Sequence, residues 1–150
     1  MDDAQAIALA LEEAKSAALR GEVPVGAVLL GADGALLARN GNRILELKDP
    51  TAHAEMLVMR AGAAAQGNER LTGATLYVSL EPCAHHGRTP PCADALLAAG
   101  LARVVVACED PFPQVAGQGL ARLRAAGVQV LLADADLARQ ARELNIGFFS

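Results

Sequence analysis

The sequence predicts an α/β protein, a three-layer α/β/α sandwich in which a mixed sheet of about five strands lies between two layers of helices. Short apolar runs rich in Val and Leu alternate with segments of helical periodicity, the pattern of a mostly parallel sheet. Two early runs flank Ala32-Asp33-Gly34, a hairpin signal, so part of the sheet is expected to be antiparallel. Because 53% of residues are hydrophobic and only 3% aromatic, the core is expected to consist of Ala, Val and Leu.

The first half of the chain supplies two predicted helices and two predicted strands. The opening helix has small and apolar residues at helical spacing, and Gly21 is placed to stop it. Asp49-Pro50-Thr51 is a good start for the second helix. The predicted elements are a helix from about Ala4 to Arg20, strands at 25–30 and 35–39, a loop at 40–43 and a helix at 52–65.

The second half alternates strand and helix. Gly100 and Gly127 are placed to end two of the helices. The predicted elements are strands at 74–80, 103–107 and 128–132, and helices at 92–99, 119–126 and 134–144. Neither repeats nor linkers interrupt the chain, so we expect its 150 residues to form one domain, 1–150.

A set of metal-ligating side chains stands out between Thr51 and Cys92. His53, Cys83 and Cys92 supply one imidazole and two thiols, and Glu55 lies two positions after the histidine. A catalytic zinc ion takes three such protein ligands and keeps its fourth position for water. The sequence therefore predicts one zinc ion per chain, held by the histidine and the two cysteines.

Glu55 is then left to act as the catalytic acid and base. Zinc lowers the pKa of bound water towards neutrality, and Glu55 can move the proton that the water loses. The predicted helix carries His53 and Glu55 in its first turn, where the helix dipole favours negative charge. A closed structural zinc site is the alternative, but it needs a fourth ligand. Two histidines remain for that role, His85 and His86, both between the cysteines.

Charge and hydropathy limit the partners and the location. The net charge is −4 and no run of basic residues occurs, which argues against a nucleic-acid partner. No apolar run reaches the length of a membrane span, and Met1-Asp2-Asp3 lacks the basic start of a signal peptide. We therefore expect a cytoplasmic protein without a membrane partner. Cys108 is expected to be a buried residue on a strand rather than a disulfide partner.

The pattern His-x-Glu, then Pro-Cys and a second Cys, resembles the cytidine-deaminase-like superfamily of zinc-dependent deaminases. The first half resembles tRNA adenosine deaminases in 21–28, Asn42-Arg43, 49–55 and 71–78. Those enzymes have two residues between their zinc cysteines, whereas eight separate Cys83 from Cys92 here. The resemblance implies a deaminase fold, and Asn42 matches the residue that touches the nucleoside in the tRNA enzymes.

The second half resembles the pyrimidine deaminase of riboflavin biosynthesis, which acts on a diaminohydroxyphosphoribosylaminopyrimidine. The matching stretches are 81–94, the Asp-Pro-x-Pro-x-Val-Ala-Gly-x-Gly of 110–119, and 144–149. This resemblance implies that His85, Arg88 and Asp110 bind the substrate. Arg88 is a permanently charged donor fork suited to a phosphate. The alternatives are a surface ion pair for Arg88 and a turn or cap before Pro111 for Asp110.

The chain also departs from the riboflavin enzymes. They usually have Asn near Glu22, His near Asn42 and often Asn where Phe112 stands, so recognition of the base is open. For Asn42 the alternative is a loop residue that caps its own turn. The tRNA enzymes usually end in a basic helix, whereas acidic residues accompany the arginines of the last thirty residues here.

Together these observations predict a zinc-dependent hydrolytic deaminase. We expect the substrate to be a small molecule, the riboflavin pyrimidine. The alternatives are tRNA adenosine, a free base or nucleoside of the guanine or cytosine type, and a zinc-binding pseudoenzyme without turnover. The last disagrees with the retention of Glu55, which a purely structural site does not need. Short chains of this superfamily generally pair, so the resemblance also implies a homodimer.

Overall fold

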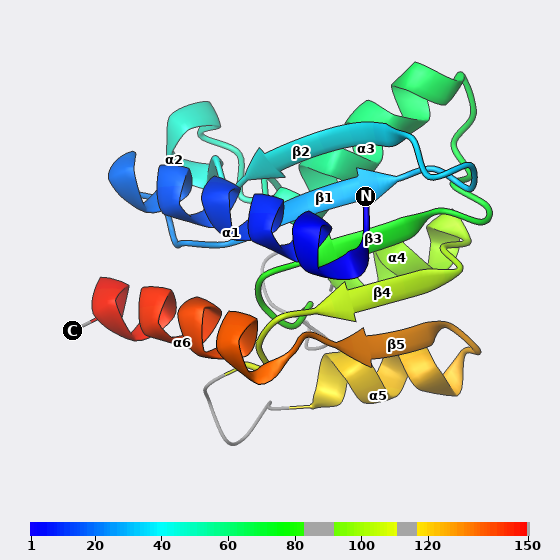
Figure 1. Ribbon diagram of the computed structural model, residues 1–150. Helices are drawn as coiled ribbons and strands as arrows, with labels where there is room; N and C mark the ends of the chain where they lie inside the picture. The colour runs from blue at the N-terminus through cyan, green and yellow to red at the C-terminus, as the bar shows by residue number, and fades with distance from the viewer. Residues whose placement is uncertain (83–91, 111–116, 150) are drawn as a thin grey trace.

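The computed structural model describes residues 1–82, 92–110 and 117–149 (Figure 1). Its sheet has the strand order β2-β1-β3-β4-β5. The strands are β1 (Gly26–Leu30), β2 (Leu36–Gly41), β3 (Thr75–Val78), β4 (Arg103–Val106) and β5 (Gln129–Leu132). The helices are α1 (Asp3–Leu19), α2 (Ile44–Leu47), α3 (Ala54–Gln66), α4 (Cys92–Ala99), α5 (Gln118–Ala125) and α6 (Ala135–Phe149).

The sheet is mixed because strand β1 runs against its neighbours. It pairs antiparallel with β2 in the predicted hairpin and antiparallel with β3 on its other side. Strands β3, β4 and β5 pair in parallel, joined by the crossover helices α4 and α5. The prediction of an α/β protein with about five strands in a mixed sheet is confirmed.

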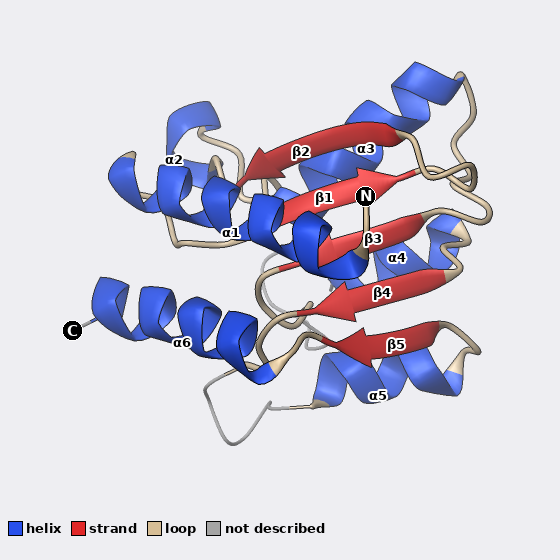
Figure 2. Cartoon of the chain, viewed as in Figure 1, coloured by secondary structure: helices blue, strands red, loops and turns tan. Residues whose placement is uncertain are grey.

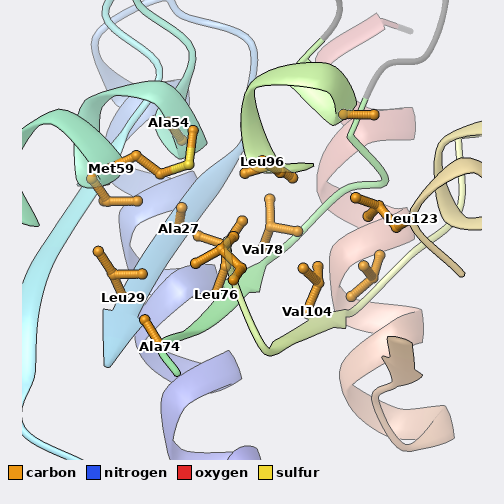
Figure 3. Close-up of a cluster of buried hydrophobic side chains, with 14 of the residues drawn as sticks. Ala27, Leu29, Ala54, Met59, Ala74, Leu76, Val78, Leu96, Val104 and Leu123 are labelled. Atoms are coloured by element: carbon orange, nitrogen blue, oxygen red, sulfur yellow. The ribbon is translucent and has the colours of Figure 1, made fainter. Parts of the chain in front are cut away.

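Helices cover both faces of the sheet (Figure 2). Helices α1 and α6 lie on one face, and α3, α4 and α5 lie on the other. Successive side chains of a strand point to opposite faces. In β1, Val28 and Leu30 therefore pack in the core with α1, whereas Ala27 and Leu29 pack with α3. Figure 3 shows the core on the side of α3, which is built mainly from Ala, Val and Leu as the composition predicts, and which also contains Met59.

Helix α1 lies unusually close to β1. A Cβ atom on Gly26 would lie 1.9 Å from the carbonyl oxygen of Ala10, so no other residue fits there without displacing the helix. Gly26 is also fixed by a hydrogen bond, because its N–H donates to Oγ of Ser79 at 2.9 Å. This contact joins β1 to the residue that follows β3, the strand that leads to Glu81.

The structure differs from the sequence prediction at three places. Helix α2 follows the predicted loop of 40–43, in a stretch for which no element was predicted, and the buried carboxylate of Glu22 accepts from the N–H groups of Leu45 and Glu46 at its start. Helix α6 runs past the predicted end at residue 144, and the side chain of Asn145 donates to the carbonyl of Ala141 within it. Cys108 is buried and free as expected, but it lies just beyond β4 rather than on the strand.

Within the described ranges, every helix falls short of the length and hydropathy that a bilayer-spanning segment needs.

A hydrogen-bonded group fastens α1 to the sheet, far from the candidate ligands. The Tyr77 hydroxyl donates to Oδ1 of Asp3 at 2.6 Å, and Arg103 donates to Oδ2 at 2.8 Å. The bond from Tyr77 and the nearby Arg103 lower the pKa of Asp3 below its ordinary 3.8. Burial and the contact with Asp3 raise the pKa of Tyr77 to about 12.

We predict that Tyr77→Phe lowers the free energy of unfolding by about 1 kcal/mol near neutral pH, the net worth of one hydrogen bond. A lowered folded-state pKa stabilises above the unfolded value of 3.8, and the stabilisation is lost as pH falls through the folded value. The difference between the variant and the parent should therefore shrink below about pH 4. Denaturant unfolding from about pH 7 to about pH 3 measures it, and a difference independent of pH contradicts the assignment.

Candidate active site

Helix α3 presents two of the predicted site residues at its start. Glu55 lies in the first turn, with 5% of its surface exposed. His53 is the N-cap residue in extended conformation rather than part of the first turn, and its side chain makes no capping hydrogen bond. The imidazole is therefore not used to complete the helix. The first-turn position of Glu55 is the one where the helix dipole favours a carboxylate.

The cap that His53 does not provide comes from Asn42. Its side-chain Oδ1 accepts from the N–H of Ala54 at 2.7 Å. Because a backbone N–H only donates, the atom that faces Ala54 must be the oxygen, and Nδ2 lies on the other branch of the amide. No described residue accepts a hydrogen bond from Nδ2. Asn42 does act as a cap, but of α3 twelve residues later rather than of its own turn.

Cys92 meets these two residues from helix α4, of which it is the first residue. It is buried, and one ligand atom each from His53, Glu55 and Cys92 lie within 4.8 Å of one another. Atoms that share one zinc ion at 2.0–2.3 Å are no more than about 4.6 Å apart, so the cluster and its nitrogen and sulfur donors fit zinc. Two of the three predicted ligands are thus together, and Cys83 lies outside the described residues.

A cavity of about 180 Å³ opens beside the cluster. It collects residues from the segment before β1, the start of α2, the start of α3, and the segments that follow β3 and β4. The lining residues are Val23, Val25, Asn42, Ile44, His53, Glu55, Leu80, Glu81 and Asp110. The structure therefore brings Asn42 and Asp110, both predicted substrate-binding residues, to one cavity with Glu55. His85 and Arg88, the other two, lie outside the described residues, as does Phe112.

Glu22, near which the riboflavin enzymes usually have Asn, does not line the cavity. Its carboxylate is engaged with the N–H groups at the start of α2, and Glu22 is not among the residues that line the cavity. The neighbouring Val23 lines it instead.

Glu81 is a residue of the site that was not predicted from the sequence. Its carboxylate is buried at the cavity and accepts from the N–H groups of Asp110, Gly117, Gly119 and Leu120. These partners lie 29 to 39 residues further along the chain, so no local sequence pattern predicts these contacts. The available signal in the sequence was an acidic residue at the end of a predicted strand, two positions before a predicted metal ligand.

Comparison with known proteins identifies the family. The profile of the cytidine and deoxycytidylate deaminase zinc-binding region matches residues 1–108. The chain belongs to this family. The matched region includes His53, Glu55 and Cys92, the three residues of the cluster.

The similar proteins include riboflavin biosynthesis proteins and a tRNA-specific adenosine deaminase. The chain is 53% identical over 96 residues to the riboflavin biosynthesis protein RibD of Escherichia coli (strain K12), which is 64% of this chain and 24% of RibD. It is 52% identical over 103 residues to the tRNA-specific adenosine deaminase of Agrobacterium fabrum, which is 69% of this chain and 63% of that one. The chain spans about a quarter of the length of the RibD relatives that it matches.

Solved structures give the same result for the fold. A structure from studies of A-to-I editing by tRNA:A34 deaminases at the wobble position of transfer RNA is 38% identical. The match has a TM-score of 0.77 and covers 94% of this chain and 99% of that chain. The expected cytidine-deaminase-like fold and the membership of this family are confirmed.

Two substitutions of Asn42 test its role in starting α3. Asn42→Ala removes the acceptor for Ala54 N–H, and we predict a loss of about 1–2 kcal/mol in the free energy of unfolding of the zinc-free protein. Asn42→Asp keeps an acceptor oxygen at a helix N-terminus and should retain most of that stability. Denaturant unfolding of both variants measures this, and an equal loss in the two would refute the capping role.

Proposed function

We propose that this protein is a zinc-dependent hydrolytic deaminase of an amino-substituted heterocycle. The cluster of His53, Glu55 and Cys92 ligand atoms within 4.8 Å, at the edge of a cavity, carries this proposal. His53 and Cys92, together with Cys83, would hold the zinc ion, and Glu55 would serve as acid and base. When bound, zinc supplies a Lewis acid that makes water acidic enough to give hydroxide near neutral pH.

In this proposal Glu55 carries the protons of the reaction. Water replaces the amino group, so a C–O bond forms, a C–N bond breaks and ammonia leaves. Glu55 accepts the proton that the attacking water loses, delivers it to a ring nitrogen and then assists the departing amine. No hydrogen bond joins its carboxylate to another described residue, so its oxygens are available for this exchange.

The cavity walls suit a flat heterocycle. Val23, Val25, Ile44 and Leu80 give apolar contact, and the Nδ2 donor of Asn42 can bind an acceptor on the ring. The cavity volume of about 180 Å³ is below the roughly 300–1,000 Å³ of sites that enclose drug-sized ligands. A single ring would therefore be enclosed, with the rest of a larger substrate outside.

For the substrate we propose the diaminohydroxyphosphoribosylaminopyrimidine of riboflavin biosynthesis. The sequence match at 81–94 and the RibD relatives support it. Charge also supports a small substrate. The net charge is −4, and Arg139 on α6 is paired with Asp136 and Glu143 rather than presented to a nucleic acid.

tRNA adenosine is the second candidate. The structure from studies of tRNA:A34 deaminases supports it, because this chain covers 99% of that chain at 38% identity. The amide of Asn42, which matches the tRNA enzymes, is consistent with a nucleoside.

Ammonia release by zinc-loaded protein separates these substrates. The panel contains the phosphoribosylamino-pyrimidine, an adenosine-bearing anticodon stem-loop, and free bases and nucleosides including guanine and cytosine. We expect turnover of the pyrimidine, and a loss of about 10²–10⁴-fold in Glu55→Ala, the typical contribution of a positioned acid or base. Turnover of the stem-loop alone would identify tRNA, rather than the pyrimidine, as the substrate. Unchanged function in Glu55→Ala with zinc retained would contradict the enzyme proposal.

Zinc binding itself is tested with two cysteine variants. Cys92→Ser removes a proposed ligand and should reduce bound zinc from one ion per chain to almost none. Cys108→Ser is the matched control, because Cys108 is also a buried cysteine but lies outside the cluster. At free zinc about 100 times the dissociation constant, the parent gains about 2.7 kcal/mol from zinc, and only Cys92→Ser should lose it. Metal analysis and thermal unfolding with and without a chelator measure both, and full zinc in Cys92→Ser contradicts the ligand assignment.

A further inference from the structure

Three acidic side chains are among the described residues that line the cavity, and one of them is already saturated with hydrogen bonds. Glu55, Glu81 and Asp110 all face the same space. Oε1 of Glu81 accepts from Asp110 N–H at 3.0 Å and Gly117 N–H at 2.8 Å. Its Oε2 accepts from Gly119 N–H at 2.7 Å and Leu120 N–H at 3.2 Å. A carboxylate has about four acceptor positions, so Glu81 has none left for a substrate.

We infer that Glu81 is a positioning residue of the metal centre. It fixes the two chain segments to which the proposed cysteine ligands are attached. This inference rests on the zinc site of the proposed function.

The first segment is the start of α5. Gly117, its N-cap residue, has no side chain that could accept from the first N–H groups of the helix. Glu81 accepts instead, from the N–H groups of Gly117, Gly119 and Leu120. A buried carboxylate is stabilised there by the positive end of the helix dipole. Helix α5 in turn packs on α4, and Arg122 of α5 is paired with Asp94 of α4. Helix α4 begins with Cys92, so the position of this ligand depends on the position of α5.

The second segment is the chain that leads into Cys83. Glu81 and Pro82 directly precede this cysteine in the sequence. A Cβ atom on Gly119 would lie 1.9 Å from the carbonyl oxygen of Pro82, so the start of α5 is in contact with Pro82 and only glycine fits. The N–H of Glu81 also donates to the carbonyl of Cys108 at 2.8 Å, which holds this segment to the end of β4. Residues 81 and 82 are therefore fixed from two sides.

Glu81→Gln tests the inference, because glutamine has the same size but replaces one oxygen by an NH₂ group. That group would face two backbone N–H donors with nothing to accept. We expect zinc affinity, measured by competition with a chromophoric chelator, to fall about 10- to 100-fold, the usual effect of losing a group that orients metal ligands. Tyr77→Phe is the matched control. It loses a hydrogen bond on the other face of the sheet and should bind zinc within about twofold of the parent.

Two outcomes of the variant experiment decide the inference. A Glu81→Gln protein that loses stability while zinc affinity stays within about twofold of the parent would overturn it, because Glu81 would then be purely structural. An equal fall in affinity for Tyr77→Phe would overturn it too, since general destabilisation would explain the effect.

A measurement on the unmodified protein covers the case in which Glu81→Gln does not fold. Coupling between two sites is reciprocal, so zinc should stabilise the contacts of Glu81 if these contacts stabilise zinc binding. We expect zinc to slow hydrogen exchange at the Gly119 and Leu120 amides at least about tenfold, and to leave the Ala10 amide of α1 unchanged. Exchange unaffected by zinc at residues 119 and 120 would overturn the inference. Neither readout needs turnover, so a protein that couples zinc to Glu81 but releases no ammonia would refute the proposed function alone.

Discussion

Three helices, two of which line the cavity, begin without a side-chain cap of their own, and a buried polar side chain from elsewhere in the chain completes each of them. Glu22 serves α2, Asn42 serves α3 and Glu81 serves α5. Unpaired N–H groups at a buried helix end are costly, so these contacts are a condition for the site to exist. Helix α1 provides the contrast, since its own Asp2 and Gln5 form a capping box at its exposed start.

This arrangement leaves the side chains of His53 and Glu55 without a structural task in helix capping. Because Asn42 caps α3, the imidazole of His53, two residues before Glu55, is not needed for that task. A similar division separates the buried carboxylates. Glu22 and Glu81 are engaged with backbone N–H groups, whereas no described residue donates to Glu55. Of these three glutamates, Glu55 is thus the one suited to moving protons.

The features that were predictable from the sequence depend on short-range patterns. Apolar runs and helical spacing located the five strands and the long helices, and the hairpin signal around residues 32–34 gave the pairing of β1 with β2. The spacing of His53, Glu55 and Cys92 predicted a cluster that the fold assembles from two helix starts. The caps were not predictable, because Glu22 acts 23 residues and Glu81 up to 39 residues along the chain. The ligand Cys83 and the substrate contacts of His85 and Arg88 stay predictions.

The coordination shell of zinc in the loaded protein tests the proposed open zinc site directly. X-ray absorption at the zinc edge resolves sulfur from nitrogen and oxygen scatterers and gives their distances. We expect two sulfur atoms at about 2.3 Å and two lighter atoms at about 2.0–2.1 Å, one from His53 and one from solvent. The lighter solvent atom should exchange for an added competing anion. A shell with fewer than two sulfur atoms, or one closed by four protein ligands, would contradict an open catalytic site.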